Sequence, residues 1–296
     1  MVVVGGAYDD FAAWRSSRAI RALQMPILVV LGLLSGIIAV WFLLRHFRLA
    51  RRRALRAEPF PDDWVRVLNR NVPLYRVLPR DLRDELHRHI NVFLEEKTFE
   101  GCGGLTITDE IRVTIASLAC VLLLNRNTNY FPGFSTILVY PETYVAPVVH
   151  RDGLVETHDE SARAGESWHQ GPVVLSWADV IRGGSQTRDG YNVVLHEFAH
   201  KLDEENDASD GLPVLGDNSQ YETWAEVLNR EYGTLRADAE RGEPTVLDEY
   251  AATSPSEFFA VATETFFEKP VELKEEHPLL YEELRKFYEV DPSSWY

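Results

Sequence analysis

The longest uninterrupted hydrophobic stretch of the sequence covers residues 25–44, which read MPILVVLGLLSGIIAVWFLL and contain no charged side chain. Twenty helical residues at about 1.5 Å each span roughly 30 Å, the hydrocarbon thickness of a bilayer. A helix of a soluble protein usually keeps a polar face, whereas this stretch is apolar on every side. The pattern predicts one transmembrane helix at residues 25–44, preceded by an N-terminal tail at residues 1–24.

A cleaved signal peptide is the alternative interpretation of this stretch. The hydrophobic region of a signal peptide has about 7–15 residues and is followed by small residues at a cleavage site. Here the hydrophobic region is longer, and a basic segment at residues 45–58 follows it, which favours an uncleaved anchor with a basic juxtamembrane linker. This C-terminal flank carries six arginines and the N-terminal flank three, so the positive-inside rule predicts a single-pass protein of the inner (cytoplasmic) membrane with residues 45–296 on the cytoplasmic side.

The rest of the chain alternates hydrophobic and polar positions with shorter periods. Leu82, Leu86 and Ile90 are spaced by four, which is typical of one face of a helix. Helices are expected near residues 79–97, 109–124, 191–204, 219–236, 256–267 and 278–289. Short runs typical of β-strands lie at residues 136–140, 145–149 and 172–177. Strands first and helices later indicate an α+β domain at residues 59–296, with a small sheet and a mainly helical C-terminal half.

Composition narrows the class of protein further. The chain is 45% hydrophobic and 11% aromatic, which is enough to bury a core. Residues 1–56 carry nine arginines and two aspartates, which gives this segment a net charge of +7. Because the whole chain has a net charge of −16, residues 57–296 carry −23. A body this acidic repels phosphate backbones, and no nucleic-acid partner is expected. The two cysteines, Cys102 and Cys120, match no zinc pattern and are expected to be ordinary reduced thiols.

The candidate chemistry lies in residues 190–203, which read GYNVVLHEFAHKLD. His196 and His200 are four apart, so a helix places both imidazoles on one face, where they can bind the same ion. Glu197 lies between them and is placed to act as general base on a water that Zn²⁺ activates. This spacing predicts one zinc ion per chain. The alternative, a pair of hydrogen-bonded core histidines without a metal, is less consistent with the apolar residues around them.

A hydrolytic zinc needs a third protein ligand, and the residues alone leave its identity open. The candidates are the carboxylates on or near the later helices, Glu226, Glu249, Glu257 and Glu264. Glu257 and Glu264 rank above the others because they are seven apart, on one face of a helix that begins near Pro255. A helix N-terminal or surface charge remains the alternative for either one. Asp203 is expected to accept a hydrogen bond from a ligand imidazole, to cap the helix end or to pair with Lys201.

Several further segments occur in an order that resembles one known family. They are ILVYP at 137–141, GESWHQGPVVLSW at 165–177, DGLP at 210–213, YAATSPSEFFAVATETFF at 250–267 and FYEVDP at 287–292. Together with residues 190–203, they make the chain similar to the Mlc titration factor A family of zinc peptidases from about residue 60 to 292.

The resemblance implies a zincin-like metallopeptidase fold and assigns roles by position. The metal ligands of the family fall on His196, His200 and Glu257, and its general base falls on Glu197. A family tyrosine falls on Tyr250, which could donate a hydrogen bond to the tetrahedral oxyanion or could serve packing. Family members are described as peptidases of aminopeptidase type whose metal core is related to that of the anthrax lethal factor protease. The founding member also binds a transcriptional repressor of sugar uptake, although it is soluble and lacks the anchor expected here.

Two functions are therefore expected from the sequence. The first is a membrane-anchored zinc peptidase that acts on a peptide or protein substrate and contacts the lipid bilayer through residues 25–44. The second is a membrane-tethered regulatory protein that binds a protein partner, with zinc structural or only weakly catalytic.

Overall fold

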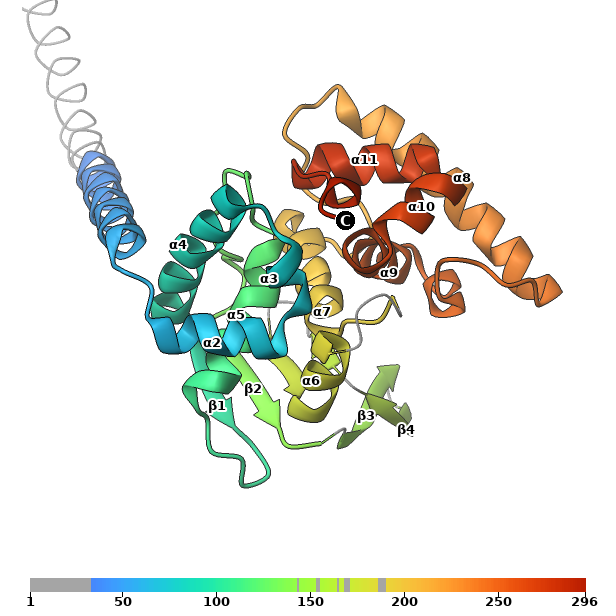
Figure 1. The fold of residues 1–296 in the computed structure, drawn as a ribbon, viewed down its shortest axis with the longest axis horizontal. Helices are drawn as coiled ribbons and strands as arrows, with labels where there is room; N and C mark the ends of the chain where they lie inside the picture. The colour runs from blue at the N-terminus through green and yellow to red at the C-terminus, as the bar shows by residue number, and fades with distance from the viewer. Residues whose placement is uncertain (1–32, 143, 153–154, 164, 168–170, 186–189) are drawn as a thin grey trace, which may run out of the picture. The chain divides into compact units, whose positions relative to one another are not determined.

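The computed structural model describes residues 33–142, 144–152, 155–163, 165–167, 171–185 and 190–296 (Figure 1). The chain divides into two compact units, Met1–Leu55 and Arg56–Tyr296. The expected N-terminal tail at 1–24 and the first part of the expected membrane helix, residues 25–32, lie outside the described residues.

A long helix, Leu33–Ala57, contains the described part of the predicted membrane segment. Among the described residues it is the one helix long and apolar enough to cross a bilayer, a criterion that a signal sequence near the N-terminus also meets. Large apolar side chains such as Ile37, Trp41 and Phe42 are more than half exposed on it. The same helix continues through residues 45–57 of the linker expected at 45–58. Alanine, leucine and arginine are all good helix formers, so the basic segment has no reason to break it.

The body contains a four-stranded mixed sheet. Its strand order is β1-β2-β6-β5, with strands Thr98–Gly101, Thr136–Tyr140, Val173–Ser176 and Gly165–Ser167. The first three strands are parallel, with Phe99 opposite Ile137 and Ile137 opposite Val173, and β5 runs antiparallel to β6 at the edge. Parallel neighbours need a crossover, and helix α5, Asp109–Val121, supplies the one between β1 and β2. Strands β3, Tyr144–Asp152, and β4, Val155–Arg163, form a separate antiparallel hairpin.

The helices form an N-terminal group, which lies beside the sheet, and a C-terminal group, which lies apart from it (Figure 1). The N-terminal group contains α2 (Asp62–Asn71), α3 (Pro73–Val77) and α4 (Arg80–Glu96), which precede α5. Then come α6 (Trp177–Ser185) and α7 (Val193–Asp203), with a 3₁₀ turn, η1, at Glu204–Asn206. The C-terminal group contains α8 (Gln220–Arg241), η2 (Glu249–Ala252), α9 (Pro255–Glu268), α10 (Pro270–Glu276), α11 (Pro278–Tyr288) and η3 (Pro292–Ser294). Helix α7 contacts α5 on one side and α9 on the other, so it joins the two groups.

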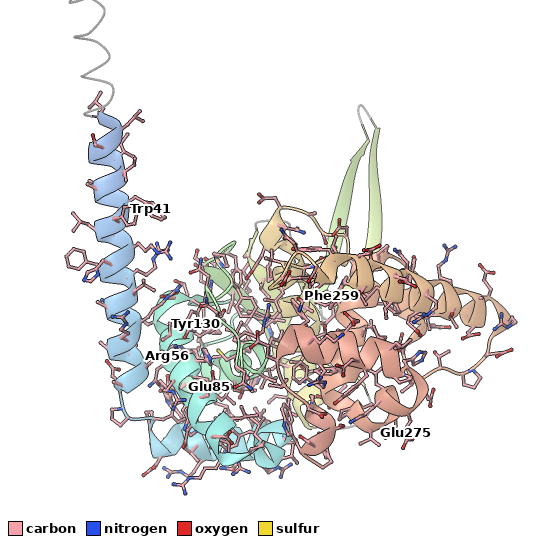
Figure 2. The ribbon with its side chains drawn as sticks, turned by 90° about the horizontal axis from the view of Figure 1, so that it is seen from above. Trp41, Arg56, Glu85, Tyr130, Phe259 and Glu275 are labelled. Atoms are coloured by element: carbon pink, nitrogen blue, oxygen red, sulfur yellow. The ribbon has the colours of Figure 1, made fainter. Side chains whose placement is uncertain are left out.

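Aromatic side chains fill the core on both sides of α7. Phe198 is fully buried against Phe131, with ring centroids 4.9 Å apart, and against Phe93 at 5.7 Å. In the C-terminal group Phe259, which Figure 2 labels, packs against Trp224 with ring centroids 5.9 Å apart. Burying large rings of this kind is worth about 1.5–3 kcal/mol each, so the contacts of Phe198 fix how α7 is rotated about its axis.

The predicted α+β class is confirmed, and so are the six expected helices, each to within a few residues at its start. The strand at 136–140 is confirmed as β2, and the run at 145–149 lies within β3. The run at 172–177 is too long by one residue at each end, because β6 begins at Val173 and Trp177 begins α6. Strand β1 was not predicted: its four residues, TFEG, are half-buried or exposed and show no apolar alternation.

Candidate metal centre

Helix α7 begins at a well-defined cap. The side chain of Asn192 accepts a hydrogen bond from the backbone N–H of Leu195 at 3.2 Å, which satisfies one of the free donors of the first turn. Phe198 faces the aromatic cluster on one side of the helix. His196 and His200 are two residues before and after it, about 200° around the helix, so they face the opposite way, toward α9.

Helix α9 presents its first turn to these histidines. Ser254 caps it by accepting from the backbone N–H of Glu257 at 3.1 Å, and Pro255 occupies the first helical position, where its missing N–H costs nothing. Glu257 is thereby fixed one turn into the helix, with its side chain 22% exposed. The local sequence S-P-S-E therefore sets both where α9 begins and where the carboxylate lies.

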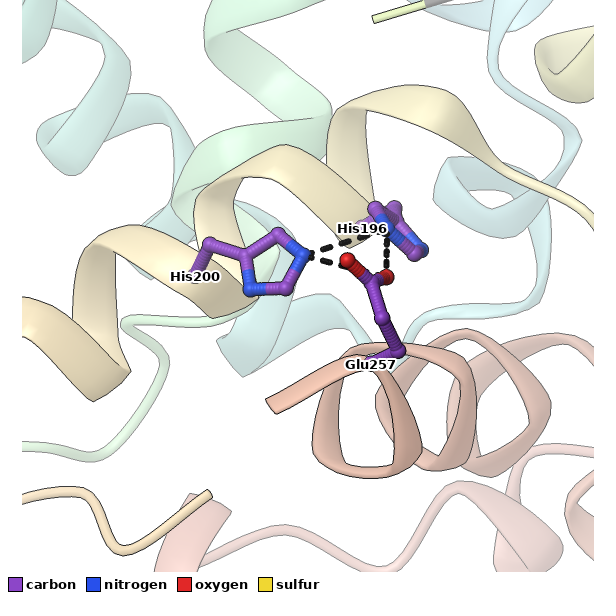
Figure 3. Close-up of side chains that lie close together, drawn as sticks. All are labelled: His196, His200 and Glu257. Carbon is purple, nitrogen blue, oxygen red and sulfur yellow. Dashed lines mark hydrogen bonds and ion pairs between the residues drawn. The ribbon is translucent and has the colours of Figure 1, made fainter. Parts of the chain in front are cut away.

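The three predicted ligand groups meet in the structure (Figure 3). The Nε2 atoms of His196 and His200 are 3.2 Å apart. Glu257 Oε2 lies 3.0 Å from His196 Nε2 and 3.4 Å from His200 Nε2. These ligand atoms all lie within 4.8 Å of one another, and they form the one such group found among the described residues. Neither Glu226 nor Glu249 takes part.

The hydrogen bonds of the two Nδ1 atoms determine whether the Nε2 atoms are free to bind a metal ion. His196 Nδ1 lies 2.8 Å from Glu264 Oε1, and His200 Nδ1 lies 3.0 Å from Ser256 Oγ. Ser256 donates its own proton to Asp203 Oδ2 at 3.1 Å, so its oxygen is left to accept from His200 Nδ1–H. With both Nδ1 atoms protonated, both Nε2 atoms carry lone pairs.

Two lone pairs and a carboxylate oxygen facing one another repel unless a cation lies among them. Glu257 Oε2 is buried and has no hydrogen-bond partner among the described residues. Two nitrogens at about 2.0–2.1 Å from a tetrahedral zinc lie roughly 3.3 Å apart, close to the 3.2 Å separation of the two Nε2 atoms. The donor set of two imidazoles and one carboxylate therefore fits a divalent cation of the zinc type.

The electrostatics of the group agree with that fit. Burial lowers the pKa of His196, but the charge of Glu264 and the contacts with both carboxylates outweigh it and raise that pKa well above the usual value. Burial raises the pKa of Glu257, but its contacts with His196 and His200 outweigh burial and lower that pKa. The raised pKa of His196 marks a site of negative potential that favours a positive charge, and the lowered pKa of Glu257 keeps its carboxylate ionised, so that it can face a divalent cation.

Glu197 lies on α7 between the two histidines and is 4% exposed. Its Oε2 atom is buried and accepts no hydrogen bond from the described residues. Burial raises the pKa of this carboxyl group to about 7, against the opposing charges of His196 and His200. It is thus a buried carboxylate with an unused acceptor, next to the ligand group but outside it.

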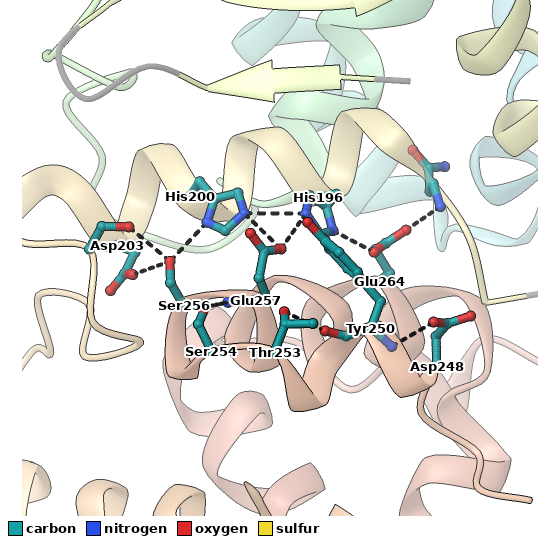
Figure 4. Close-up of polar contacts among 12 residues, drawn as sticks. His196, His200, Asp203, Asp248, Tyr250, Thr253, Ser254, Ser256, Glu257 and Glu264 are labelled. Carbon is teal, nitrogen blue, oxygen red and sulfur yellow. Dashed lines mark hydrogen bonds and ion pairs between the residues drawn. The ribbon is translucent and has the colours of Figure 1, made fainter. Parts of the chain in front are cut away.

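Tyr250 lies beside the same histidine from a different element. It belongs to η2, and its ring centroid is 6.1 Å from that of His196 (Figure 4). The backbone holds it firmly: its N–H donates to Asp248 Oδ1 at 2.9 Å, and its carbonyl accepts from Thr253 Oγ1 at 2.7 Å. The side chain remains 52% exposed, so the ring flanks the site and also faces solvent.

Two carboxylates take places that the sequence did not predict. Asp203 Oδ2 accepts from Ser256 Oγ and from the backbone N–H of Gly211 at 2.9 Å, so Ser256 stands between Asp203 and His200 where a direct hydrogen bond was expected. Glu264, weighed as a ligand, lies on the Nδ1 edge of His196, away from the ligand atoms. Ser256 was missed altogether, because a serine after proline gives no more than a helix-start signal.

Comparison with known proteins places this site in a family. Residues 46–289 match the family described as glucose-regulated metallo-peptidase M90. An uncharacterized protein of Synechocystis sp. strain PCC 6803, slr2042, is 41% identical over 271 residues, which cover 91% of this chain and 98% of that protein. Mlc titration factor A of Yersinia pestis strain Pestoides F is 31% identical over 234 residues, covering 78% of this chain and 85% of that protein.

Mlc titration factor A of Yersinia pseudotuberculosis serotype O:1b is also 31% identical to this chain over 234 residues. The match spans most of the body, including both α7 and α9, which carry the three ligand groups. The chain belongs to the glucose-regulated metallo-peptidase M90 family, and it is similar to Mlc titration factor A over most of its length.

Proposed function

We propose that this chain is a membrane-anchored, zinc-dependent peptidase of aminopeptidase type. One observation carries the proposal: the ligand atoms of His196, His200 and Glu257 face one another, and beside them lies a buried carboxylate oxygen of Glu197 that accepts no hydrogen bond from the described part of the chain. Membership of a metallopeptidase family supports a divalent metal at this group. We also propose that residues 59–296 have a zincin-like fold, and that their metal core is related to that of anthrax lethal factor.

The chain's own residues divide the work of hydrolysis. His196, His200 and Glu257 would hold one Zn²⁺, which would supply a Lewis acid for polarising a carbonyl and lowering the pKa of a water. Glu197 Oε2 takes a proton from the attacking water and returns it to the leaving amine. Tyr250 Oη donates a hydrogen bond to the oxyanion, from a ring whose position beside His196 supports that role. Asp203 holds Ser256, and through it the His200 ring.

Location at the membrane is the third part of the proposal. The apolar helix Leu33–Ala57 supports an anchor, and the arginines that follow the predicted span at residues 25–44 support a cytoplasmic body at the inner membrane. The lipid bilayer is then a partner of the N-terminal unit, and a peptide or protein substrate is the partner of the site.

The test compares the wild type with Glu197→Gln, both as the full chain in detergent. We expect one zinc per chain in both, because Glu197 is outside the ligand group. We expect cleavage of aminoacyl and peptide reporters to fall by about 10²–10⁴-fold in the variant, since an amide cannot accept the proton. A wild type that binds no zinc would overturn the metal site. Equal activity of the two proteins would overturn the role of Glu197.

A second candidate function rests on a relative's name. Mlc titration factor A is named for titrating Mlc, so a protein partner is a reasonable second proposal for this chain. In that case zinc would serve structure or a minor activity. The same variant separates the two functions: a biological effect that survives Glu197→Gln, with zinc retained, favours partner binding over catalysis.

A further inference from the structure

Glu264 lies in the third turn of α9 and is almost completely buried, with its side chain 3% exposed. Its two oxygens face two different donors at the start of α7 (Figure 4). Oε1 lies 2.8 Å from His196 Nδ1, and Oε2 accepts from the backbone N–H of Asn192. The carboxylate therefore bridges the two helices that carry the metal ligands, yet it stays outside the ligand group.

An imidazole can present the lone pair of Nε2 to a metal only when its proton lies on Nδ1. A carboxylate on the Nδ1 edge selects that tautomer, fixes the rotation of the ring and makes Nε2 a stronger ligand. The backbone N–H of Asn192 fixes the carboxylate in turn, because it lies at the cap of α7, one turn before His196.

We infer that Glu264 is a positioning residue of the metal centre, which holds His196 with Nε2 facing His200 and Glu257. The inference rests on the proposed function, because it concerns the metal that those three residues would bind. The two histidines are supported unequally: His200 has the neutral hydroxyl of Ser256 on its Nδ1 edge, whereas His196 has a buried carboxylate. We therefore expect a charged partner to strengthen metal binding by His196 more than by His200.

The chain offers a matched control one turn further along α9. Glu268 is also buried, at 2% exposure, and it accepts from the Asn192 side-chain amide at 3.1 Å. No contact joins it to either histidine among the described hydrogen bonds. Replacing Glu268 by glutamine removes a buried charge from the same helix at the same volume, without touching the ring of a ligand.

The experiment measures the dissociation constant for Zn²⁺ by competition with a chromophoric chelator, using the full chain in detergent. It compares the wild type, Glu264→Gln, Glu264→Leu and Glu268→Gln. In Glu264→Gln an oxygen still accepts from His196 Nδ1–H, but the charge is lost and an amide N–H faces the Asn192 N–H. Loss of such a partner typically costs about 10- to 100-fold in metal affinity. We expect that loss for Glu264→Leu, a smaller loss for Glu264→Gln, and wild-type affinity for Glu268→Gln.

Circular dichroism of each metal-free variant shows whether it is folded, and the volume-matched glutamine variant keeps the test valid if Glu264→Leu is not. A folded Glu264→Gln that binds Zn²⁺ as tightly as the wild type overturns the inference. Equal losses in the Glu264 and Glu268 glutamine variants also overturn it, because the effect would then come from packing of α9. A wild type that binds no Zn²⁺ overturns the proposed function, a result distinguishable from either of these.

Discussion

At the residue scale, each imidazole of the metal centre uses its two nitrogens for different purposes. The Nε2 atoms converge on Glu257, and the Nδ1 atoms are held by acceptors on α9, Glu264 and Ser256. Helix α9 therefore supplies one ligand and both ring supports from a single face. A shift of α9 against α7 would disturb all of these contacts together, so the residues of the site act as a unit.

Ser256 should matter for stability as well as for metal binding. Its hydroxyl accepts from His200 Nδ1 and donates to Asp203 Oδ2, so Ser256→Ala removes the acceptor of a buried imidazole N–H and leaves Asp203 Oδ2 with the Gly211 N–H. Leaving buried polar groups unpaired costs about 1–3 kcal/mol. We expect a lower thermal midpoint for metal-free Ser256→Ala, together with weaker Zn²⁺ binding.

Ser209→Ala is the matched control for that prediction. The Ser209 hydroxyl lies 2.8 Å from Ser256 Oγ but contacts neither His200 nor Asp203 in the described hydrogen bonds. It should therefore leave Zn²⁺ affinity close to that of the wild type. If the Ser256 and Ser209 variants behave alike, the link from Asp203 through Ser256 to His200 does not support the ring.

At the scale of elements, α7 is held on two sides by different kinds of contact. Polar groups from α9 fix its histidine face, and aromatic rings fix the other face through Phe198. Phe131, which packs on Phe198, has a left-handed backbone with φ 53°, a conformation that costs a non-glycine residue about 1–2 kcal/mol. The packing around Phe131 stabilises this conformation, as does a hydrogen bond that Lys97 Nζ donates to the Phe131 carbonyl oxygen at 2.6 Å.

Truncating this aromatic contact should affect the metal centre at a distance. Phe198→Ala removes a fully buried ring, which costs about 3–5 kcal/mol, and lets α7 shift toward the space left behind. We expect a lower thermal midpoint and weaker Zn²⁺ binding. Phe287→Ala, in α11, should lower the midpoint and leave Zn²⁺ affinity near the wild-type value. Unchanged affinity in Phe198→Ala would mean that polar contacts alone position α7.

The helices that carry the site were predictable because their signals are local. An asparagine cap, a serine and proline at a helix start, and hydrophobic spacing all lie within a few residues of one another. Strand β1 was not predictable, because its place depends on pairing with β2, 38 residues further along. Helix α6 contains two glycines that argue against a helix, and tertiary packing outweighs them.

The candidate site was predictable in part for the same reason. The pair His196 and His200 follows from helical spacing alone. The roles of Glu264 and Ser256 depend on how α9 meets α7, at sequence separations of 68 and 56 residues, and no local pattern encodes that meeting. The residues alone ranked Glu257 and Glu264 together as candidates for the third ligand. The family resemblance favoured Glu257, and the packing of the two helices brings Glu257 to the ligand atoms and Glu264 to the opposite edge of His196.

At the scale of the whole molecule, the N-terminal segment and the rest of the chain carry opposite net charges. The first 56 residues carry +7, and the rest carries −23. Only the arginine-rich segment gains from an anionic lipid surface, at about 1 kcal/mol per arginine near that surface, whereas the acidic body is repelled by it. Attachment to a membrane should therefore depend on the N-terminal segment and on apolar insertion.

That expectation can be tested by fractionation and by fusion. We expect the full chain to stay in the membrane pellet after washing with high salt or alkaline carbonate, because insertion of an apolar helix does not depend on screened charges. A chain lacking residues 1–44 should move to the soluble fraction. Green fluorescent protein fused after Tyr296 should fluoresce, and alkaline phosphatase fused there should be inactive, since both report a cytoplasmic C-terminus. Release of the full chain by salt alone would mean that the arginines, and not the apolar helix, hold it at the membrane, and an active phosphatase fusion would reverse the proposed orientation.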